Sequence, residues 1–249
     1  MNDLLNTLAS WKPFRAAVLG DFMLDQLVYG DAERLSADAP VPVLHVRRTE
    51  DRPGGAANVA MDLVALGGRV TAIGVTGADA DGATLRAALQ RERVEIDGLV
   101  SDPGRPTTVK RSLIGLAQAR HPQKMFRVDY ESRDPLSEGV AGQLLERLGG
   151  VLERVDVLCV EDYAKGVCTP GLCARAIAMA RERGVPVFVD PAAIADYSRY
   201  RGCTAITPNR TEAERATGIP THHDADPAHN AALARRLMET LDLEAAVLT

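Results

Sequence analysis

The 249-residue sequence lacks several features that mark common classes of protein. Only 4% of its residues are aromatic, and no apolar run approaches the roughly 20 residues that a membrane-spanning helix needs. The N-terminus has no basic stretch followed by an apolar core, so we expect no signal peptide and a cytoplasmic location. The formal net charge is only -5, which favours a small-molecule partner over nucleic acid.

Cysteine is also scarce in this sequence. The four cysteines, at positions 159, 168, 173 and 203, form no C-x-x-C pair. Zinc needs a tighter and more complete set of ligands, so we expect free thiols in a reducing compartment.

Neither a G-x-x-x-x-G-K-[ST] loop nor a G-x-G-x-x-G turn after a strand occurs. A P-loop protein and a dinucleotide-binding fold are therefore disfavoured.

What the sequence does contain is an alternation of short apolar runs with helical stretches. The apolar runs predict strands at 16–19, 70–74, 157–160, 185–189, 205–207 and 245–248. The intervening stretches predict helices at 55–66, 81–90, 140–152, 170–183, 212–217 and 227–241. This alternation is typical of an α/β fold in which a mostly parallel sheet is covered by helices on both faces. We predict a single α/β domain over residues 1–249.

Two helix starts can be predicted from local motifs. Thr169 followed by Pro170 is typical of an N-cap residue with proline at the first helical position. Thr211 and Glu214 have the spacing of a capping box, which predicts that Thr211 caps the following helix.

Two stretches interrupt the alternation and predict a small β lid. Residues 41–46 are extended and proline-flanked, while 107–116 and 124–128 are rich in β-branched and basic residues without a helix between them. We place the lid at about 26–50 and 104–130. Its basic residues form either a solvated surface or a clamp for a sugar phosphate, since Arg and Lys pair naturally with phosphate. They are Lys110, Arg111, Arg120, Lys124 and Arg127.

Acidic and amide side chains follow the ends of several predicted strands. Ligands of an open parallel sheet bind beyond the carboxyl ends of its strands, so these side chains mark a candidate site. Any one of them alone could equally be a helix cap or a turn residue, but together they favour binding. They are Asp21, Asp25, Glu161, Asp162, Asp190, Asn209 and Glu212, and Lys165 lies in the same segment as Glu161 and Asp162.

The segment from Arg52 to Ala60, Arg-Pro-Gly-Gly-Ala-Ala-Asn-Val-Ala, is the sharpest motif. Gly54 and Gly55 remove side-chain bulk where a helix starts, so a ligand can approach the free backbone N–H groups. Asn58 adds an amide that suits vicinal sugar hydroxyls because it both donates and accepts. Close packing of helices through small residues is the alternative interpretation, with Asn58 as a local cap.

Together these motifs resemble the ribokinase-like (PfkB) carbohydrate kinases. The resemblance rests on Gly20-Asp21 with Met23-Leu24-Asp25, on Ser36–Val43 and on Arg52–Ala60. Within the family, the Asp162-Tyr163-Ala164-Lys165-Gly166 motif is most similar to the D-glycero-β-D-manno-heptose-7-phosphate kinases, the kinase parts of bifunctional heptose enzymes.

The resemblance implies ATP-dependent phosphorylation of the anomeric hydroxyl of a sugar phosphate, with Mg²⁺ as cofactor. Heptose 7-phosphate would give heptose 1,7-bisphosphate for ADP-heptose synthesis. The implied substrate-binding residues are Asp21, Asp25, Gly54, Gly55, Asn58, Lys110, Arg127, Asp162 and Lys165. Those implied for the nucleotide phosphates are Asp190, Asn209 and Glu212, of which Asn209 and Glu212 match the N-x-x-E motif that orders magnesium.

A homodimer through the lid is also expected. The extended segments are too few to close a sheet of their own, and pairing with a second copy would cover their edges. Lids in this family often clasp each other, which points the same way.

Three departures from the family pattern stand out. Ala192 occupies a position where the subgroup usually has lysine, and Ser112 one where arginine often follows the lid lysine. The family's Gly-Ala-Gly-Asp segment, which supplies the aspartate base, does not occur before Thr249. We therefore expect an incomplete domain whose base lies beyond Thr249 and which does not transfer phosphate. A catalytically inactive sugar-phosphate-binding protein and a kinase of another sugar are the alternatives.

Overall fold

The computed structural model describes residues 6, 10–116, 121–222 and 224–249, which build two sheets. The larger has seven strands in the order β11-β10-β9-β8-β1-β4-β5, and every neighbouring pair is parallel. Its strands are β1 (Arg15–Gly20), β4 (Arg69–Gly77), β5 (Glu95–Asp102), β8 (Val157–Glu161), β9 (Val187–Asp190), β10 (Ala205–Ile206) and β11 (Ala245–Ala246). The predicted mostly parallel α/β fold is thus confirmed.

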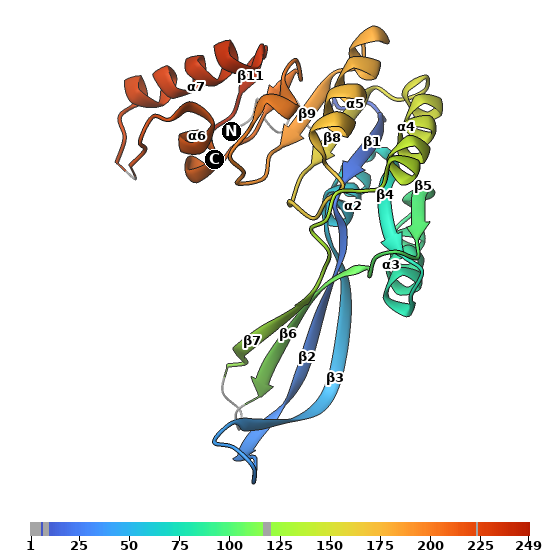
Figure 1. Cartoon of the computed structure of the whole chain (residues 1–249), viewed down its shortest axis with the longest axis vertical. Coiled ribbons are helices and arrows are strands. Elements are labelled where there is room, and N and C mark those ends of the chain that lie inside the picture. Colours follow the sequence, from blue (N-terminus) through green and yellow to red (C-terminus); the bar gives the residue numbers. More distant parts are fainter. Residues whose placement is uncertain (1–5, 7–9, 117–120, 223) are drawn as a thin grey trace.

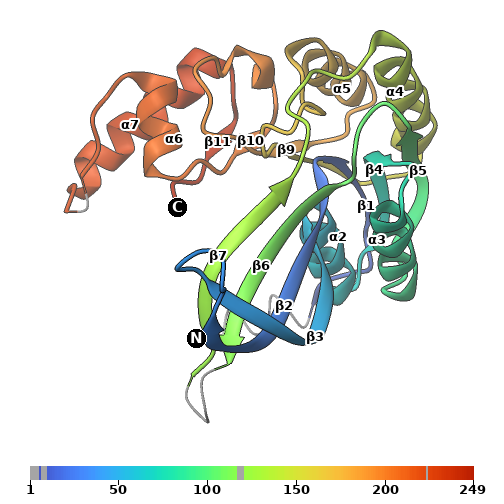
Figure 2. The same cartoon turned by 60° about the horizontal axis from the view of Figure 1, so that its bottom comes forward.

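Helices cover both faces of this sheet (Figures 1 and 2). On one face lie α2 (Ala56–Ala65) and α3 (Ala80–Arg91), and on the other α4 (Glu138–Leu152) and α5 (Pro170–Glu182). The remaining helices, α6 (Arg210–Thr217) and α7 (Pro227–Leu241), lie beside the β10–β11 end. Within the described part of the chain, none of these helices combines the length and apolar content needed to cross a membrane.

Strand β1 shows why an unbroken apolar run forms the centre of this sheet. Ala17 and Leu19 belong to the hydrophobic core under α4 and α5, whereas Ala16 and Val18 belong to the core under α2 and α3. Because successive side chains of a strand point to opposite faces, a strand buried on both sides must be apolar throughout. The edge strand β5 was missed in the sequence because it alternates polar with apolar residues.

The second sheet is a four-stranded lid that extends from the body on long strands (Figure 1). Its order is β3-β2-β6-β7, and its strands are β2 (Phe22–Leu35), β3 (Pro42–Gly55), β6 (Thr108–Leu116) and β7 (Gln123–Tyr130). The lid was predicted, but its strands are longer than expected, since β2 begins directly after Asp21. The four strands form an open sheet in which β3 and β7 are the edges.

The helix starts give one confirmation and one correction. Thr169 Oγ1 accepts a hydrogen bond from the Leu172 amide at 3.2 Å, so the predicted cap of α5 is confirmed. The capping box of α6 uses other residues than the predicted Thr211 and Glu214, because this helix begins at Arg210.

Candidate functional site

The predicted site residues lie where the lid joins the carboxyl edge of the parallel sheet (Figure 1). Strand register brings the last residues of three neighbouring strands side by side. Gly20 of β1 pairs with Glu161 of β8, and Glu161 pairs with Asp190 of β9. The acidic residues that follow separate strands in the sequence are therefore neighbours in space.

Asp21 is almost fully buried, with 2% of its surface exposed. Its Oδ2 accepts hydrogen bonds from the amides of Tyr163 at 2.8 Å and Lys165 at 3.1 Å, and its Oδ1 accepts one from Val167 at 3.3 Å. Burial raises the pKa of this carboxyl to about 6, against the opposing effect of these hydrogen bonds. Asp21 thus fixes the loop 162–167 beside the lid.

Asp162 fixes the same loop from its other side. Its Oδ1 accepts a hydrogen bond from the Ala164 amide at 2.7 Å, and its Oδ2 accepts one from the hydroxyl of Tyr200 at 2.6 Å. Ala164 has a φ of 54°, a left-handed conformation that is uncommon for a residue with a side chain. The interactions of Asp162 stabilise this turn, which places Lys165 towards the lid.

Two basic residues connect this loop to the end of the lid. Lys165 Nζ lies 2.5 Å from Glu131 Oε2, and this pair is largely buried. Arg105 Nη2 donates to the carbonyl oxygens of Asp134 at 2.9 Å and of Lys165 at 3.4 Å. The loop after β8 and the two connections to the lid therefore form one hydrogen-bonded unit.

One face of the lid is turned towards this loop and carries charged groups. Asp25 on β2 pairs in register with Lys110 on β6, which in turn pairs with Asp129 on β7. The Lys110 Nζ lies 5.2 Å from the centre of the Tyr163 ring. Arg127 lies two residues from Asp129 and makes a two-pronged contact with it, at 2.7 and 2.8 Å. Asp25, Lys110 and Arg127 therefore share the face nearest the loop.

The basic residues of the lid do not all gather on this face. Arg111 points to the opposite side of β6 from Lys110, and its guanidinium packs 4.9 Å from the centre of the Tyr130 ring. Arg120 lies outside the described residues. A clamp formed from the whole basic cluster is therefore not seen, whereas Lys110 and Arg127 remain candidates.

The paired glycines allow β3 to pass into α2 close beside the lid. A Cβ on Gly54 would lie 2.5 Å from Asp25 Oδ2. Gly55 has a φ of 57°, and a Cβ there would lie 2.5 Å from the Cε of Met23. Larger residues would clash at both positions, and at Gly55 the backbone conformation itself favours glycine. This steric requirement explains the two glycines without a ligand. The absence of a side chain at Gly54 also leaves the Asp25 carboxylate accessible from the neighbouring cavity.

Asn58 lies in the first turn of α2, near this glycine pair. Its Nδ2 donates a hydrogen bond to Asp62 Oδ2 at 3.0 Å. Asn58 and Asp25 both line a cavity of about 480 Å³ between β3, α2 and α3. Asp25 and Asn58, both predicted to bind the sugar, thus line the same cavity.

A second cavity, of about 350 Å³, is lined by the loop 162–167 itself. Asp162, Lys165, Asp190 and Glu212 line it. Burial raises the pKa of both Asp190 and Glu212, although Asp190 Oδ1 accepts a hydrogen bond from the Thr207 hydroxyl at 3.1 Å. Asp190 and Glu212, two of the three residues predicted for the nucleotide, therefore line a cavity separate from that of Asp25.

Asn209 and Glu212 also have a structural role in the helix that follows. Asn209 Oδ1 accepts from the Glu212 amide at 3.1 Å, and Glu212 Oε2 accepts from the Asn209 amide at 2.8 Å. Within the described ranges, no three acidic, histidine or cysteine side chains cluster as a metal site. Asp190 and Glu212 do supply carboxylate oxygens to one cavity, which suits a Mg²⁺ ion held mainly by nucleotide phosphates and water.

Glu161 is a carboxylate that the sequence placed at the candidate edge but to which it gave no binding role. It is 6% exposed, and its Oε2 is buried without a hydrogen-bond partner among the described residues. Burial and the neighbouring Asp190 raise the pKa of Glu161 to about 8. Its place at the end of a strand was the available signal, because an acid there interrupts an otherwise apolar run.

The comparisons with known proteins agree with this architecture. Residues 14–248 match the model of the pfkB family carbohydrate kinases. The bifunctional protein HldE of Geobacter sulfurreducens is 44% identical over 94% of this chain and 46% of its own length. HldE of Gluconacetobacter diazotrophicus is 43% identical over 87% of this chain and 44% of its own. The chain thus spans about half the length of the curated relatives it matches.

Solved structures share the fold at low sequence identity. The tetrameric inhibited form of Escherichia coli phosphofructokinase-2 gives a TM-score of 0.71 at 18% identity, over 94% of this chain and 73% of that one. Arabidopsis thaliana ribokinase with ribose and ATP gives 0.68 at 16%, over 95% and 72%. With the family match extending over nearly all of its length, the chain belongs to the pfkB family of carbohydrate kinases.

Proposed function

We propose that the carboxyl edge and the lid bind a sugar phosphate and present its anomeric hydroxyl to ATP. The observation that carries the proposal is the charged lid face, where Asp25, Lys110 and Arg127 are turned towards the loop after β8. A carboxylate suits sugar hydroxyls, and the two basic groups suit the phosphate. One lid face therefore offers complementary groups for both parts of a sugar phosphate.

The remaining residues divide between the two cavities. Asn58 joins Asp25 at the first cavity, where its amide can donate to and accept from neighbouring hydroxyls. Asp21 and Asp162 act by fixing the loop that carries Tyr163 and Lys165, since their own oxygens are engaged inside the protein.

The second cavity is the proposed site of the nucleotide phosphates, with Asp190 and Glu212 lining it and Asn209 capping the helix that carries Glu212. When Mg²⁺ is bound with ATP, it neutralises phosphate charge, which is the main requirement of phosphoryl transfer. The chain's own contribution is to hold the loop 162–167 rigid between the lid face and the nucleotide cavity, so that the reacting groups are held in position.

We propose heptose 7-phosphate as the sugar phosphate, with heptose 1,7-bisphosphate as the product for ADP-heptose synthesis. The Asp162-Tyr163-Ala164-Lys165-Gly166 motif resembles the heptose-7-phosphate kinases, and the identity of 44% to HldE of Geobacter sulfurreducens supports the same subgroup. A kinase of another sugar is the competing proposal, which the choice of ligands below separates.

We also propose a cytoplasmic homodimer that forms through the lid. The lid exposes apolar side chains that a second copy would cover, among them Val46, Phe126 and Tyr130, each about half exposed. Light scattering at micromolar concentration tests this, and a monomer would contradict it.

The binding proposal is tested by titration calorimetry with heptose 7-phosphate, fructose 6-phosphate, ribose 5-phosphate and free heptose. Lys110→Gln should weaken heptose 7-phosphate binding roughly tenfold, because a charge-assisted contact to phosphate is lost. Lys124→Gln, a neutralised lysine elsewhere in the lid, is the matched control and should bind normally.

Two results would contradict the proposal. Equal affinity of the wild type for heptose 7-phosphate and free heptose would show that the lid does not read the phosphate. Tighter binding of one of the other sugar phosphates would replace heptose as the substrate and leave the site in place.

A further inference from the structure

The amino edge of the parallel sheet, at the opposite ends of the same strands, gathers arginines. Arg15 is the first residue of β1 and Arg69 the first of β4, and the two pair directly in register. Both side chains therefore point to the same face, which is the face covered by α4. Like charges directly opposite each other on adjacent strands destabilise a sheet, so this pairing requires a compensating interaction.

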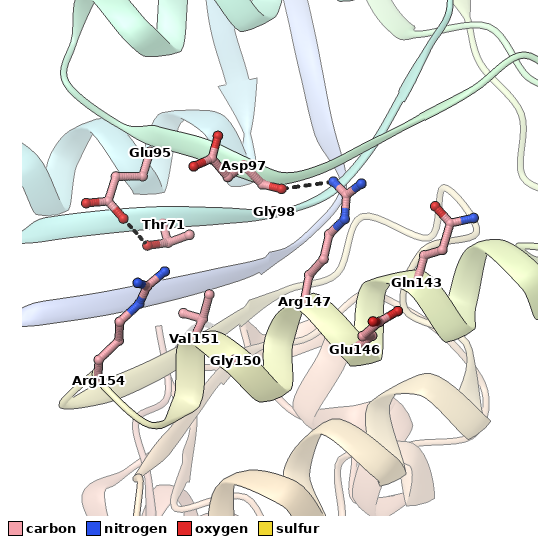
Figure 3. Close-up of a pocket in the computed structure, with 10 residues that line it drawn as sticks. All are labelled: Thr71, Glu95, Asp97, Gly98, Gln143, Glu146, Arg147, Gly150, Val151 and Arg154. Atoms are coloured by element: carbon pink, nitrogen blue, oxygen red, sulfur yellow. Dashed lines mark hydrogen bonds between the residues drawn. The ribbon is translucent and has the colours of Figure 1, made fainter.

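A third arginine approaches from the helix above this pair. Arg154 follows α4, and Figure 3 shows its side chain directed towards Thr71 and Glu95. Arg15 Nη1 donates to the carbonyl of Arg154 at 3.3 Å, which holds the backbone of Arg154 over the strands. The guanidinium groups of Arg69 and Arg154 make no hydrogen bond or ion pair within the described part of the chain.

The three arginines line a cavity of about 250 Å³. Glu95 is the one carboxylate among the described residues lining it, and its Oε2 accepts a hydrogen bond from the Thr71 hydroxyl at 2.8 Å. Asp156 lies next to the cavity, where its Oδ2 accepts from the backbone amide of Arg15 at 2.7 Å. Positive charge therefore remains in excess inside the cavity.

An adjoining cavity of about 530 Å³ has a different charge balance (Figure 3). There Arg147 Nη1 donates to the carbonyl oxygens of Asp97 at 2.9 Å and Leu99 at 2.7 Å, so it already connects α4 to β5. The side chains of Asp97 and Glu146 also line this cavity. The uncompensated positive charge is thus confined to the end formed by Arg15, Arg69 and Arg154.

We propose that these three arginines form a binding site for a phosphoryl anion, separate from the candidate kinase site. A guanidinium presents a planar fork of N–H donors that matches phosphate oxygens, and two unpaired guanidiniums are available here. Bound phosphate would offset the repulsion between Arg15 and Arg69 and would accept from Arg154. The Thr71 hydroxyl lies on the same cavity and is a further polar group. The phosphoryl group can come from free pyrophosphate or from a nucleoside diphosphate.

Titration calorimetry with pyrophosphate and with ADP, at low ionic strength, tests the site. The double variant Arg69→Gln/Arg154→Gln should lower pyrophosphate affinity by roughly tenfold or more, because two charge-assisted contacts are lost. Arg235→Gln/Arg236→Gln removes two exposed arginines of α7 and is the control for overall charge. Lys124→Gln removes an exposed lid lysine outside the candidate site and is the control for charge on the lid.

The pattern across these variants decides the proposal. Loss of pyrophosphate binding in the Arg69/Arg154 variant, with normal binding in both controls, supports it. If ADP affinity falls in parallel, the ligand is a nucleotide, and if ADP is unaffected, it is a free phosphate anion. No binding by the wild type, or an equal loss in either control, overturns it.

A second variant leaves the arginines in place and should raise pyrophosphate affinity instead of lowering it. Glu95→Gln keeps an oxygen that can accept from Thr71 but removes the carboxylate that competes for the arginines. Pyrophosphate affinity should therefore rise several-fold. Unchanged or weaker binding by a folded Glu95→Gln protein would contradict an anion site in this cavity.

Discussion

At the carboxyl edge of the parallel sheet, Asp21 and Asp162 are buried and accept hydrogen bonds from the backbone of a single loop. At the amino edge, Arg69 and Arg154 are exposed, and their guanidinium groups have no partner within the described residues. The first pair of charges shapes the protein, whereas the second is free to meet a ligand. Acidic residues at a strand end are therefore not automatically ligand contacts, even in a family where ligands bind at that edge.

This contrast sorts the residues of the carboxyl edge into two groups. Asp21 and Asp162 support the loop from inside, while Asp25, Asn58 and Lys110 are the side chains left to contact a sugar. Variants of the first group should affect folding, and variants of the second should affect binding.

The largest effect that we expect concerns turnover. The sequence contains no Gly-Ala-Gly-Asp segment, and Asp190, the remaining carboxylate after a late strand, accepts a hydrogen bond from Thr207. General-base help is worth about 10²–10⁴-fold, and kinases usually turn over at about 1–100 per second. We expect this chain to consume ATP with heptose 7-phosphate below about 0.1 per second. A rate in the usual range would show that a carboxylate of the described site acts as the base.

The next prediction compares how substitutions at the carboxyl edge and at the amino edge of the sheet change the free energy of unfolding. Asp21→Ala leaves three backbone amides without their acceptor in a buried region, so unfolding free energy should fall by about 3 kcal/mol. Arg69→Gln, at the amino edge, should change it by no more than about 0.5 kcal/mol. Urea denaturation measures both. Similar losses of unfolding free energy in the two variants would contradict the view that Asp21 supports the fold whereas Arg69 does not.

A third test uses the pH dependence of stability. The pKa of Glu161 is raised from 4.5 to about 8 by burial, so the native state retains a proton that the unfolded chain has released. Stability should therefore fall as the pH rises between these two values, by up to about 1.4 kcal/mol per pH unit. Glu161→Gln should flatten this slope and be the more stable protein at pH 8.

The control for this slope is Glu239→Gln, which removes an exposed carboxylate of α7 and should behave as the wild type. Urea denaturation between pH 5 and pH 8 compares the three proteins. An unchanged slope in Glu161→Gln would mean that this side chain is ionised in the native state.

The smallest effect concerns binding alone. Asp25→Ala and Asn58→Ala should each weaken heptose 7-phosphate binding by about 0.5–1.5 kcal/mol, the usual net value of one hydrogen bond. Their melting temperatures should remain close to that of the wild type, since neither side chain is fully buried. A variant that unfolds while the other binds normally would assign a structural role to the residue that was changed.

The sequence predicted the alternation of strands and helices well, because buried parallel strands must be apolar on both faces. It also placed Asp21 and Asp162 at the correct edge of the sheet. It could not show that their oxygens bind the loop 162–167, because in Asp21 this contact joins residues about 140 positions apart in the chain. The pairing of Arg15 with Arg69 likewise depends on strand order and register, which no local pattern contains.

The most direct test of the proposed sugar-phosphate site is the shift in melting temperature caused by heptose 7-phosphate, compared with free heptose and with inorganic phosphate. The Arg69→Gln/Arg154→Gln protein is the suitable background, because it removes anion binding at the amino edge. A ligand at a hundredfold excess over its Kd adds about 2.7 kcal/mol of stability, or roughly 5–10 °C for a protein of this size. We predict a shift of this order for heptose 7-phosphate and a much smaller shift for the other two ligands. Equal shifts for heptose 7-phosphate and free heptose would contradict a lid that reads the phosphate.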